Sequence, residues 1–212
     1  MKEFSVYGLG SGGSKCVDMI ARHLIMAQEK AIFRIYDYDN VSPFNVWNQL
    51  YSMKDVGKNK MVALNNHLAT LENESDDDFI TVKLEAINGY DREPKGITLV
   101  MVDSMAARRK IYLMWKEAIF SSSVLIENRL DAECVATYCV TRHTEVMKRY
   151  ENTLYDDPPV DENRDVCKVR ESSYISTLNA VLAAKYALKG GVDCPFETMV
   201  GLADPITIMT KK

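Results

Sequence analysis

The residues best suited to chemistry lie in one stretch, YDYDNVSPFNVWNQ, at residues 36–49. Asp37 and Asp39 follow directly on an apolar run that is predicted to be a buried strand. Carboxylates accept hydrogen bonds and side-chain amides both donate and accept them, so the stretch carries more hydrogen-bonding capacity than a surface turn needs. We therefore expect it to hold a polar ligand. The residues with this capacity are Asp37, Asp39, Asn45, Asn48 and Gln49.

A glycine-rich stretch near the start of the chain, GLGSGGS, is suited to binding phosphate. Gly8, Gly10 and Gly13 fit the pattern G-x-G-x-x-G, and Ser11 and Ser14 add hydroxyl groups. Glycines let the backbone approach a phosphate, and the helix that follows offers free N–H groups. The alternative is a strand-to-helix turn without a ligand. The position of the loop, between a strand and an amphipathic helix, favours a nucleotide.

Short apolar runs and amphipathic stretches alternate along most of the chain, and they are the elements that must position these residues. The apolar runs predict strands at residues 4–7, 31–36, 79–86, 97–102, 124–127, 134–140 and 206–209. Helical spacing predicts helices at residues 14–28, 58–71, 104–120 and 175–188. The alternation is typical of an α/β fold with a Rossmann-like, doubly wound, mainly parallel sheet and antiparallel edge strands.

The length of 212 residues suits a single domain. We expect a nucleotide-binding core at residues 1–142 and a closing helix with an edge strand at residues 172–212. Between them, residues 143–171 are polar and contain DDPPVDENRD, which predicts a long crossover loop.

The composition excludes several kinds of partner. The formal net charge is -4, so a nucleic acid is not expected. No apolar run reaches membrane-spanning length, and the first glycine comes too early for a signal peptide. Five cysteines without a CxxC pair fit a reducing compartment. We expect a cytoplasmic protein that binds neither membrane nor nucleic acid.

Four ordered motifs together resemble the ThiF/MoeB/HesA family, whose adenylating fold is shared with ubiquitin-activating enzymes. The first is the glycine loop, and the second is D-x-D-x-V-x-x-x-N-x-x-x-Q at residues 37–49. The third, D-x-G-x-x-K, ends at Lys60, and the fourth is Asp103 with Arg108 five positions later. The resemblance covers residues 6–108 in family order, and residues 172–191 resemble the closing helix of the family. It implies ATP and Mg²⁺ as cofactors, a small ubiquitin-like or sulfur-carrier protein as the substrate that is adenylated, and a homodimer.

The resemblance also implies roles for single residues. Asp37 would accept hydrogen bonds from the ribose, Asn45 would contact phosphate or ribose, and Lys60 would bind the triphosphate. Asp103 would hold Mg²⁺, and the implied catalytic residues are Asp103, Lys60 and Cys167. The implied nucleotide contacts are Gly8, Gly10, Ser11, Gly13, Asp37, Asp39, Asn45, Asn48, Gln49, Lys60 and Arg108.

Each of these residues also has a simpler interpretation. Asp37 and Asp39 could cap a turn, and Lys60 could be one of several solvated lysines. Asp103 could begin a helix as its N-cap. Cys167 could be an inert thiol, or it could take the activated acyl group or form a persulfide, with Lys168 lowering the pKa of its thiol.

One position departs from the family pattern. Most members have an arginine before the glutamine, and here the residue is Asn48. An asparagine cannot make a charged bidentate contact with phosphate. Four arginines are candidates to replace this charge, namely Arg34, Arg108, Arg109 and Arg129. Later segments, at residues 129–133 and 150–155, resemble compact ThiF-like proteins of phages and plasmids, a branch in which the arginine is also absent.

Two other functions remain open on the sequence. A nucleotide-binding or protein-interaction module without catalysis would explain Asn48. A nicotinamide-dependent oxidoreductase would explain the glycine loop together with Asp37. A second acid and an asparagine-rich loop, which a dehydrogenase does not need, argue against the oxidoreductase.

Overall fold

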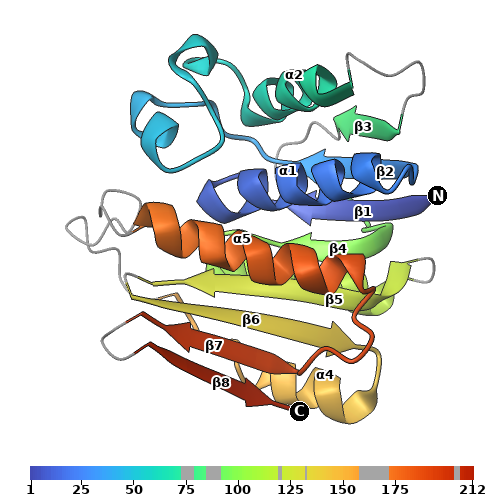
Figure 1. Cartoon of the computed structure of the whole chain (residues 1–212). Helices are drawn as coiled ribbons and strands as arrows, with labels where there is room; N and C mark the ends of the chain where they lie inside the picture. The colour runs from blue at the N-terminus through green and yellow to red at the C-terminus, as the bar shows by residue number, and fades with distance from the viewer. Residues whose placement is uncertain (73–78, 85–91, 119–120, 132, 158–171, 203–205) are drawn as a thin grey trace.

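The computed structural model describes residues 1–72, 79–84, 92–118, 121–131, 133–157, 172–202 and 206–212. Its described strands form one eight-stranded sheet in the order β3-β2-β1-β4-β5-β6-β7-β8 (Figure 1). The strands are β1 (Lys2–Tyr7), β2 (Ala31–Tyr36), β3 (Ile80–Leu84), β4 (Gly96–Val100), β5 (Ser121–Leu130), β6 (Cys134–Thr141), β7 (Glu197–Gly201) and β8 (Thr207–Lys211). The helices are α1 (Ser11–Met26), α2 (Lys60–Glu72), α3 (Met105–Glu117), α4 (Thr144–Glu151) and α5 (Ser172–Leu188), with 3-10 turns η1 (Pro43–Trp47) and η2 (Met53–Asp55).

The sheet has a parallel half and an antiparallel half. Strands β3, β2, β1, β4 and β5 pair in parallel, whereas β5, β6, β7 and β8 pair in antiparallel fashion. The predicted α/β class, with its Rossmann-like sheet and antiparallel edge strands, is confirmed. In the parallel half the carboxyl ends of the strands meet at one edge, where open α/β sheets bind ligands.

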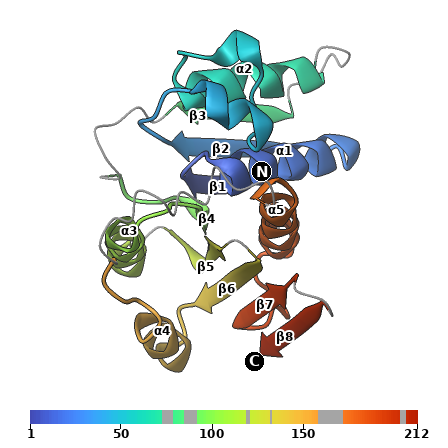
Figure 2. The same ribbon diagram turned by 90° about the vertical axis from the view of Figure 1, so that its left-hand side faces the viewer.

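Helices cover both faces of the sheet (Figure 2). Helices α1, α2 and α5 bury their apolar sides in one core with residues of β1 and β2 such as Phe4, Phe33 and Ile35. Helices α3 and α4 form a second core on the opposite face, around Trp115, Tyr112 and Tyr150. Because both faces are covered, β1 and β2 need nearly continuous apolar sequences, which is why these strands were predictable.

Two elements differ from the sequence-based expectation. Helix α4 lies inside the segment expected to be a loop from residue 143, and strand β7 was not predicted. Tyr150 is the buried residue of α4, so the helix carries too short an apolar pattern to reveal itself. The rest of the expected crossover, residues 158–171, lies outside the described residues, and Cys167 lies there too.

The search for membrane-spanning segments gives a negative result for the part of the chain that the structure describes. None of its helices combines the length and the apolar character that crossing a bilayer requires.

Candidate nucleotide site

A cavity of about 530 Å³ opens at the carboxyl ends of the parallel strands. Its walls come from the loop after β1, the loop after β2 with η1, the start of α2, the loop after β4, the first turn of α3, the end of β5, and α5. Of the residues expected to bind nucleotide or metal, it brings together Gly8, Gly10, Ser11, Asp37, Asp39, Asn45, Gln49, Lys60, Asp103 and Arg108.

The glycines of the first loop are needed for different reasons. Gly8 has φ +89°, and a Cβ on it would lie 2.6 Å from the carbonyl oxygen of Met101. A Cβ on Gly13 would lie 2.0 Å from the carbonyl oxygen of Gly8, so Gly13 packs inside the loop rather than lining the cavity. A Cβ on Gly10 would meet nothing within 4 Å, and Gly10 lines the cavity. Gly8 and Gly13 therefore shape the loop, and Gly10 leaves room for a ligand.

Asp37 ties the two loops together. One carboxylate oxygen accepts from the backbone N–H of Leu9 at 2.6 Å, and the other accepts from that of Asp39 at 2.8 Å. Burial raises the pKa of Asp37, although the positive charge of Lys60 and the two backbone donors oppose the rise. Asp37 thus stabilises its own turn and also lines the cavity, so the two interpretations of this residue do not exclude each other.

Lys60 is a buried cation at the first residue of α2. Its ammonium nitrogen lies 2.8 Å from a carboxylate oxygen of Asp39, and its side chain is 7% exposed. Lys54 and Lys58 are exposed, so Lys60 is distinct from these solvated lysines. The Asp39 carboxylate is about half exposed at 52%, so it remains open to water while it pairs with Lys60.

The turn η1 places Asn45 and Gln49 at the cavity but not Asn48, although all three belong to the second motif. The Asn45 side-chain oxygen accepts from the backbone N–H of Ser42 at 2.8 Å, which holds Asn45 at the cavity. Gln49 is buried and also lines the cavity, and its side-chain oxygen has no hydrogen-bond partner among the described residues. Asn48 is buried as the C-cap of η1 and is not one of the lining residues. The position that carries arginine in relatives is therefore turned into the protein.

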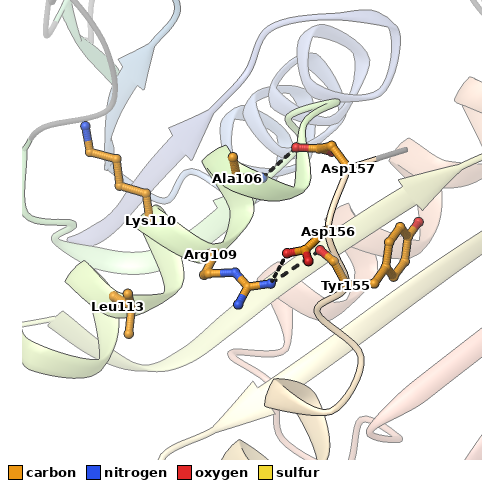
Figure 3. Close-up of a pocket in the computed structure, with 7 residues that line it drawn as sticks. All are labelled: Ala106, Arg109, Lys110, Leu113, Tyr155, Asp156 and Asp157. Atoms are coloured by element: carbon orange, nitrogen blue, oxygen red, sulfur yellow. Dashed lines mark hydrogen bonds and ion pairs between the residues drawn. The ribbon is translucent and has the colours of Figure 1, made fainter. Parts of the chain in front are cut away.

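Asp103 lies exposed at the cavity, one residue before the N-cap of α3. Ser104 is that N-cap, because its side chain accepts from the backbone N–H of Ala107. The Asp157 carboxylate covers the same helix end, accepting from the backbone N–H of Met105 at 2.6 Å and from that of Ala106 at 3.0 Å (Figure 3 shows the Ala106 contact). Since two other residues cap the helix, the Asp103 carboxylate is left for the cavity.

Arg108 reaches the cavity from a buried ion cluster. Its two terminal nitrogens donate to Glu127, to the backbone oxygen of Val102, and at 2.7 Å to the backbone oxygen of Asn128. Glu127 has no solvent exposure and is shared with Arg129. The Tyr150 hydroxyl donates to Glu127 at 3.1 Å. Burial and the charge of Glu127 raise the pKa of Tyr150, so the phenol stays protonated as a donor.

Comparison with models of known protein families identifies the family of this chain. Residues 2–190 match the model of the ThiF family. The chain belongs to the ThiF family. A search of curated proteins finds no match.

Several solved structures share this fold, and their chains are longer than this one. The microcin C7 biosynthetic enzyme MccB, in complex with N-formylated MccA, has a TM-score of 0.67 at 19% identity and covers 100% of this chain and 64% of its own. PaaA has a TM-score of 0.65 at 18% identity, covering 99% of this chain and 64% of PaaA. MccB of E. coli with ATP has a TM-score of 0.61 at 16% identity and covers 100% of this chain and 63% of that one. The chain therefore spans somewhat under two thirds of these proteins.

Each of the four arginines considered as replacements for the charge at Asn48 makes contacts within the chain. Arg34 lies 3.7 Å from Glu3, and Arg109 lies 3.5 Å from Asp156 (Figure 3). Arg129 is bound to Glu127 and to Thr153. Of the four, only Arg108 lines the cavity, and its terminal nitrogens are already engaged.

Several lining residues of this ThiF-family member were not expected. Among them are Asn128 and Leu130 at the end of β5, and Asn179 in α5. Asn128 comes one residue after the apolar run that predicted its strand, and Asn179 stands in an otherwise apolar helix. A polar residue on an apolar helix was a usable signal. The contact between Asn128 and Asn179 could not be predicted from the sequence, because it depends on how α5 packs on β5.

Proposed function

We propose that this chain is an ATP-dependent adenylyltransferase that activates the C-terminal carboxylate of a small ubiquitin-like or sulfur-carrier protein. The observation that carries this proposal is the convergence of the glycine loop, Asp37, Lys60 and Asp103 on one cavity. The ThiF family membership supports it as well. The proposal includes a homodimer and a role for Cys167 downstream of adenylation, both taken from the family resemblance.

The nucleotide would lie across the ends of β1 and β2. Asp37 is placed to accept from ribose hydroxyls, and Gly10 leaves the space that phosphate needs next to the N-terminus of α1. The first N–H groups of a helix have no partners within the helix, so they are natural phosphate donors. Lys60 adds a positive charge at the cavity from the first residue of α2.

Asp103 fits a Mg²⁺ ion that is shared with the nucleotide. The described residues contain no group of three or more His, Cys, Asp or Glu side chains that could enclose a metal. Mg²⁺ is commonly bound by one or two carboxylates together with substrate phosphates and water, and an exposed carboxylate at the cavity satisfies that need. When bound, the ion would offset phosphate charge during the reaction.

The proposed reaction needs the chain to align two negatively charged groups. An oxygen of the acyl carboxylate attacks the α-phosphorus of ATP and forms a P–O bond, and pyrophosphate leaves with the electrons of the broken bond. The lining residues include two cations, Lys60 and Arg108, and three carboxylates, Asp37, Asp39 and Asp103. The carboxylates therefore outnumber the cations that could attract a negatively charged substrate. The orientation of the carboxylate is therefore at least as important as its attraction to the site.

ATP–pyrophosphate exchange tests the proposal. With a panel of candidate carrier proteins and peptides, we expect exchange by the unaltered protein, and a loss of about 100-fold or more in Asp103→Ala. Calorimetry should still detect ATP binding by that variant, because Asp37 and the glycine loop remain. Absence of exchange with every candidate, together with absence of ATP binding, would sink the proposal.

A second candidate function is nucleotide binding without turnover. Two observations favour it: Lys60 is already paired with Asp39, and Asn48 is turned away from the cavity. It predicts ATP or AMP binding without pyrophosphate exchange under any condition. Exchange that depends on Asp103 excludes it.

A further inference from the structure

Helix α5 lies beside α1 and brings one polar side chain to the glycine loop (Figure 1). Asn179 is only 4% exposed, and it lines the cavity together with Gly10, Ser11 and Gly12 at the start of α1. A Cβ placed on Gly12 would lie 3.4 Å from the side-chain nitrogen of Asn179. The Asn179 amide therefore lies against the first turn of α1, where the proposed nucleotide site would hold phosphate.

The orientation of the Asn179 amide is determined by Asn128. The Asn128 side-chain nitrogen donates at 2.7 Å to the backbone carbonyl oxygen of Asn179, and it also donates to the Asn179 side-chain oxygen. A backbone carbonyl can only accept, so the nitrogen of the Asn128 amide must face α5. The atom of the Asn179 amide that meets this donor must then be its oxygen, and the Asn179 nitrogen is turned towards Gly12.

The Asn179 side-chain nitrogen is a donor that no residue in the described part of the chain accepts from. Buried polar groups are nearly always paired, so this donor indicates a ligand or water at the cavity. The N–H groups in the first turn of the 16-residue helix α1 have no acceptor inside that helix either. Donors that converge from a helix start and from a neighbouring side chain complement a phosphate group, because its oxygens can accept from all of them.

We propose that Asn179 is a phosphate-binding residue, whose side-chain nitrogen donates to a phosphate of the nucleotide held at the start of α1. Asn128 is the positioning residue that keeps this nitrogen directed at the phosphate. Helix α5 then completes the nucleotide site as well as covering the sheet, and it does so through a contact that lies outside the four sequence motifs. This inference rests on the proposed nucleotide site and assigns one further residue to it.

An isosteric substitution of Asn179 changes the atom that faces the phosphate and keeps the contact with Asn128. In Asn179→Asp one carboxylate oxygen still accepts from Asn128, while the other replaces the donor nitrogen and brings a negative charge. We expect ATP affinity to fall about tenfold in Asn179→Ala, as the loss of one hydrogen bond to a charged group would give, and further in Asn179→Asp. Adenosine, which has no phosphate, should bind to both variants as it binds to the unaltered protein.

Two further variants separate binding from packing. Ser176 accepts from the Lys15 ammonium at 2.8 Å, so it also joins α5 to α1, but it is not one of the residues that line the cavity. Ser176→Ala is therefore the matched control and should leave the affinities for ATP and adenosine unchanged. Asn128→Ala removes the donor that orients Asn179. It should lower ATP affinity by less than Asn179→Ala does, again without a change for adenosine.

Calorimetry with adenosine and ATP separates this inference from the proposed function. Unchanged ATP affinity in a folded Asn179 variant overturns the phosphate contact, and so does an equal loss for ATP and adenosine. The proposed function stands in both cases, because the unaltered protein still binds ATP. If neither Asn179 variant folds, Asn128→Ala decides, and an unchanged ratio of ATP to adenosine affinity overturns the inference. If the unaltered protein does not bind ATP, the nucleotide site is refuted and the proposed function fails with it.

Discussion

The two ends of the cavity are built in different ways. At the nucleotide end, local backbone groups of Asp39 and Ser42 hold Asp37 and Asn45, and longer contacts join Asp37 to Leu9 and Lys60 to Asp39. At the end formed by β5 and α5, side-chain contacts join residues far apart in sequence, as Arg108 with Glu127 and Asn128 with Asn179. The first kind of site can be recognised as a motif. The second kind depends on the packing of whole elements.

The largest expected effect concerns the ion cluster of Arg108, Glu127 and Arg129. In Glu127→Ala the buried Arg108 and the partly buried Arg129 lose their shared counter-charge. We expect a loss of about 3–5 kcal/mol in the free energy of unfolding, measured by urea denaturation. Glu127→Gln, which keeps the size and one acceptor oxygen, serves as the control and should lose less. A loss of only about 0.5 kcal/mol, typical of a surface substitution, would contradict the importance of this cluster.

The next prediction distinguishes Gly13, which is needed for the conformation of the glycine loop, from Gly10, which leaves room for a ligand. Gly13→Ala should cost about 1–3 kcal/mol or more, because its Cβ would overlap the carbonyl oxygen of Gly8. Gly10→Ala should leave the melting temperature nearly unchanged, since Gly10 has an ordinary φ of -70° and open space around its Cβ position. Its ATP affinity, measured by calorimetry, should nevertheless fall by about tenfold, because the methyl group occupies the cavity. Unchanged ATP affinity in Gly10→Ala would show that phosphate does not use this space.

The smallest effect concerns the contact between Asp157 and the start of α3. Hydrogen bonds from the backbone N–H groups of Met105 and Ala106 lower the pKa of Asp157 below its ordinary value of 3.8. A lowered pKa means that its contribution to stability is present above about pH 3.8 and is lost as the pH falls through the lower, folded-state value. Asp157→Ala should therefore cost about 1 kcal/mol at pH 7, and the cost should shrink towards zero in acid.

Denaturant titrations of Asp157→Ala and the unaltered protein at several pH values check this behaviour. Asp156→Ala is a suitable control, because the Asp156 side chain is fully exposed and its contact with Arg109 is long, at 3.5 Å. A cost for Asp157→Ala that stays constant down to pH 2 would show that the carboxylate charge is not involved.

Much of the fold could be predicted because its parallel half is buried on both faces. Strands β1 and β2 stand out as apolar runs, and the predicted range of β2, residues 31–36, matches the observed strand. The antiparallel half was harder to predict. Strand β7 has only five residues, and α4 buries little beyond Tyr150, so neither has a long periodic pattern.

The candidate site shows the same division. Ten of the expected binding residues line one cavity, whereas Asn48 and Gly13 do not, because one is turned inward at the end of η1 and the other packs inside its loop. Motif spacing places a residue along the chain, but the local backbone decides which way its side chain points. Asn128, Leu130 and Asn179 have no motif, so no spacing could have assembled them.

The sequence by itself determined the family and the parallel core and pointed to the proposed nucleotide end, because motif spacing and apolar periodicity can be read from neighbouring residues. Only the tertiary structure decided how Arg108, Asn128 and Asn179 are held at the cavity. The amide orientation of Asn128 follows from the carbonyl of Asn179, and the single donor left on Arg108 follows from Glu127 and two backbone oxygens. Apart from the Arg108 contact with Val102 six residues away, these contacts join residues 19 or more apart, which only packing brings together.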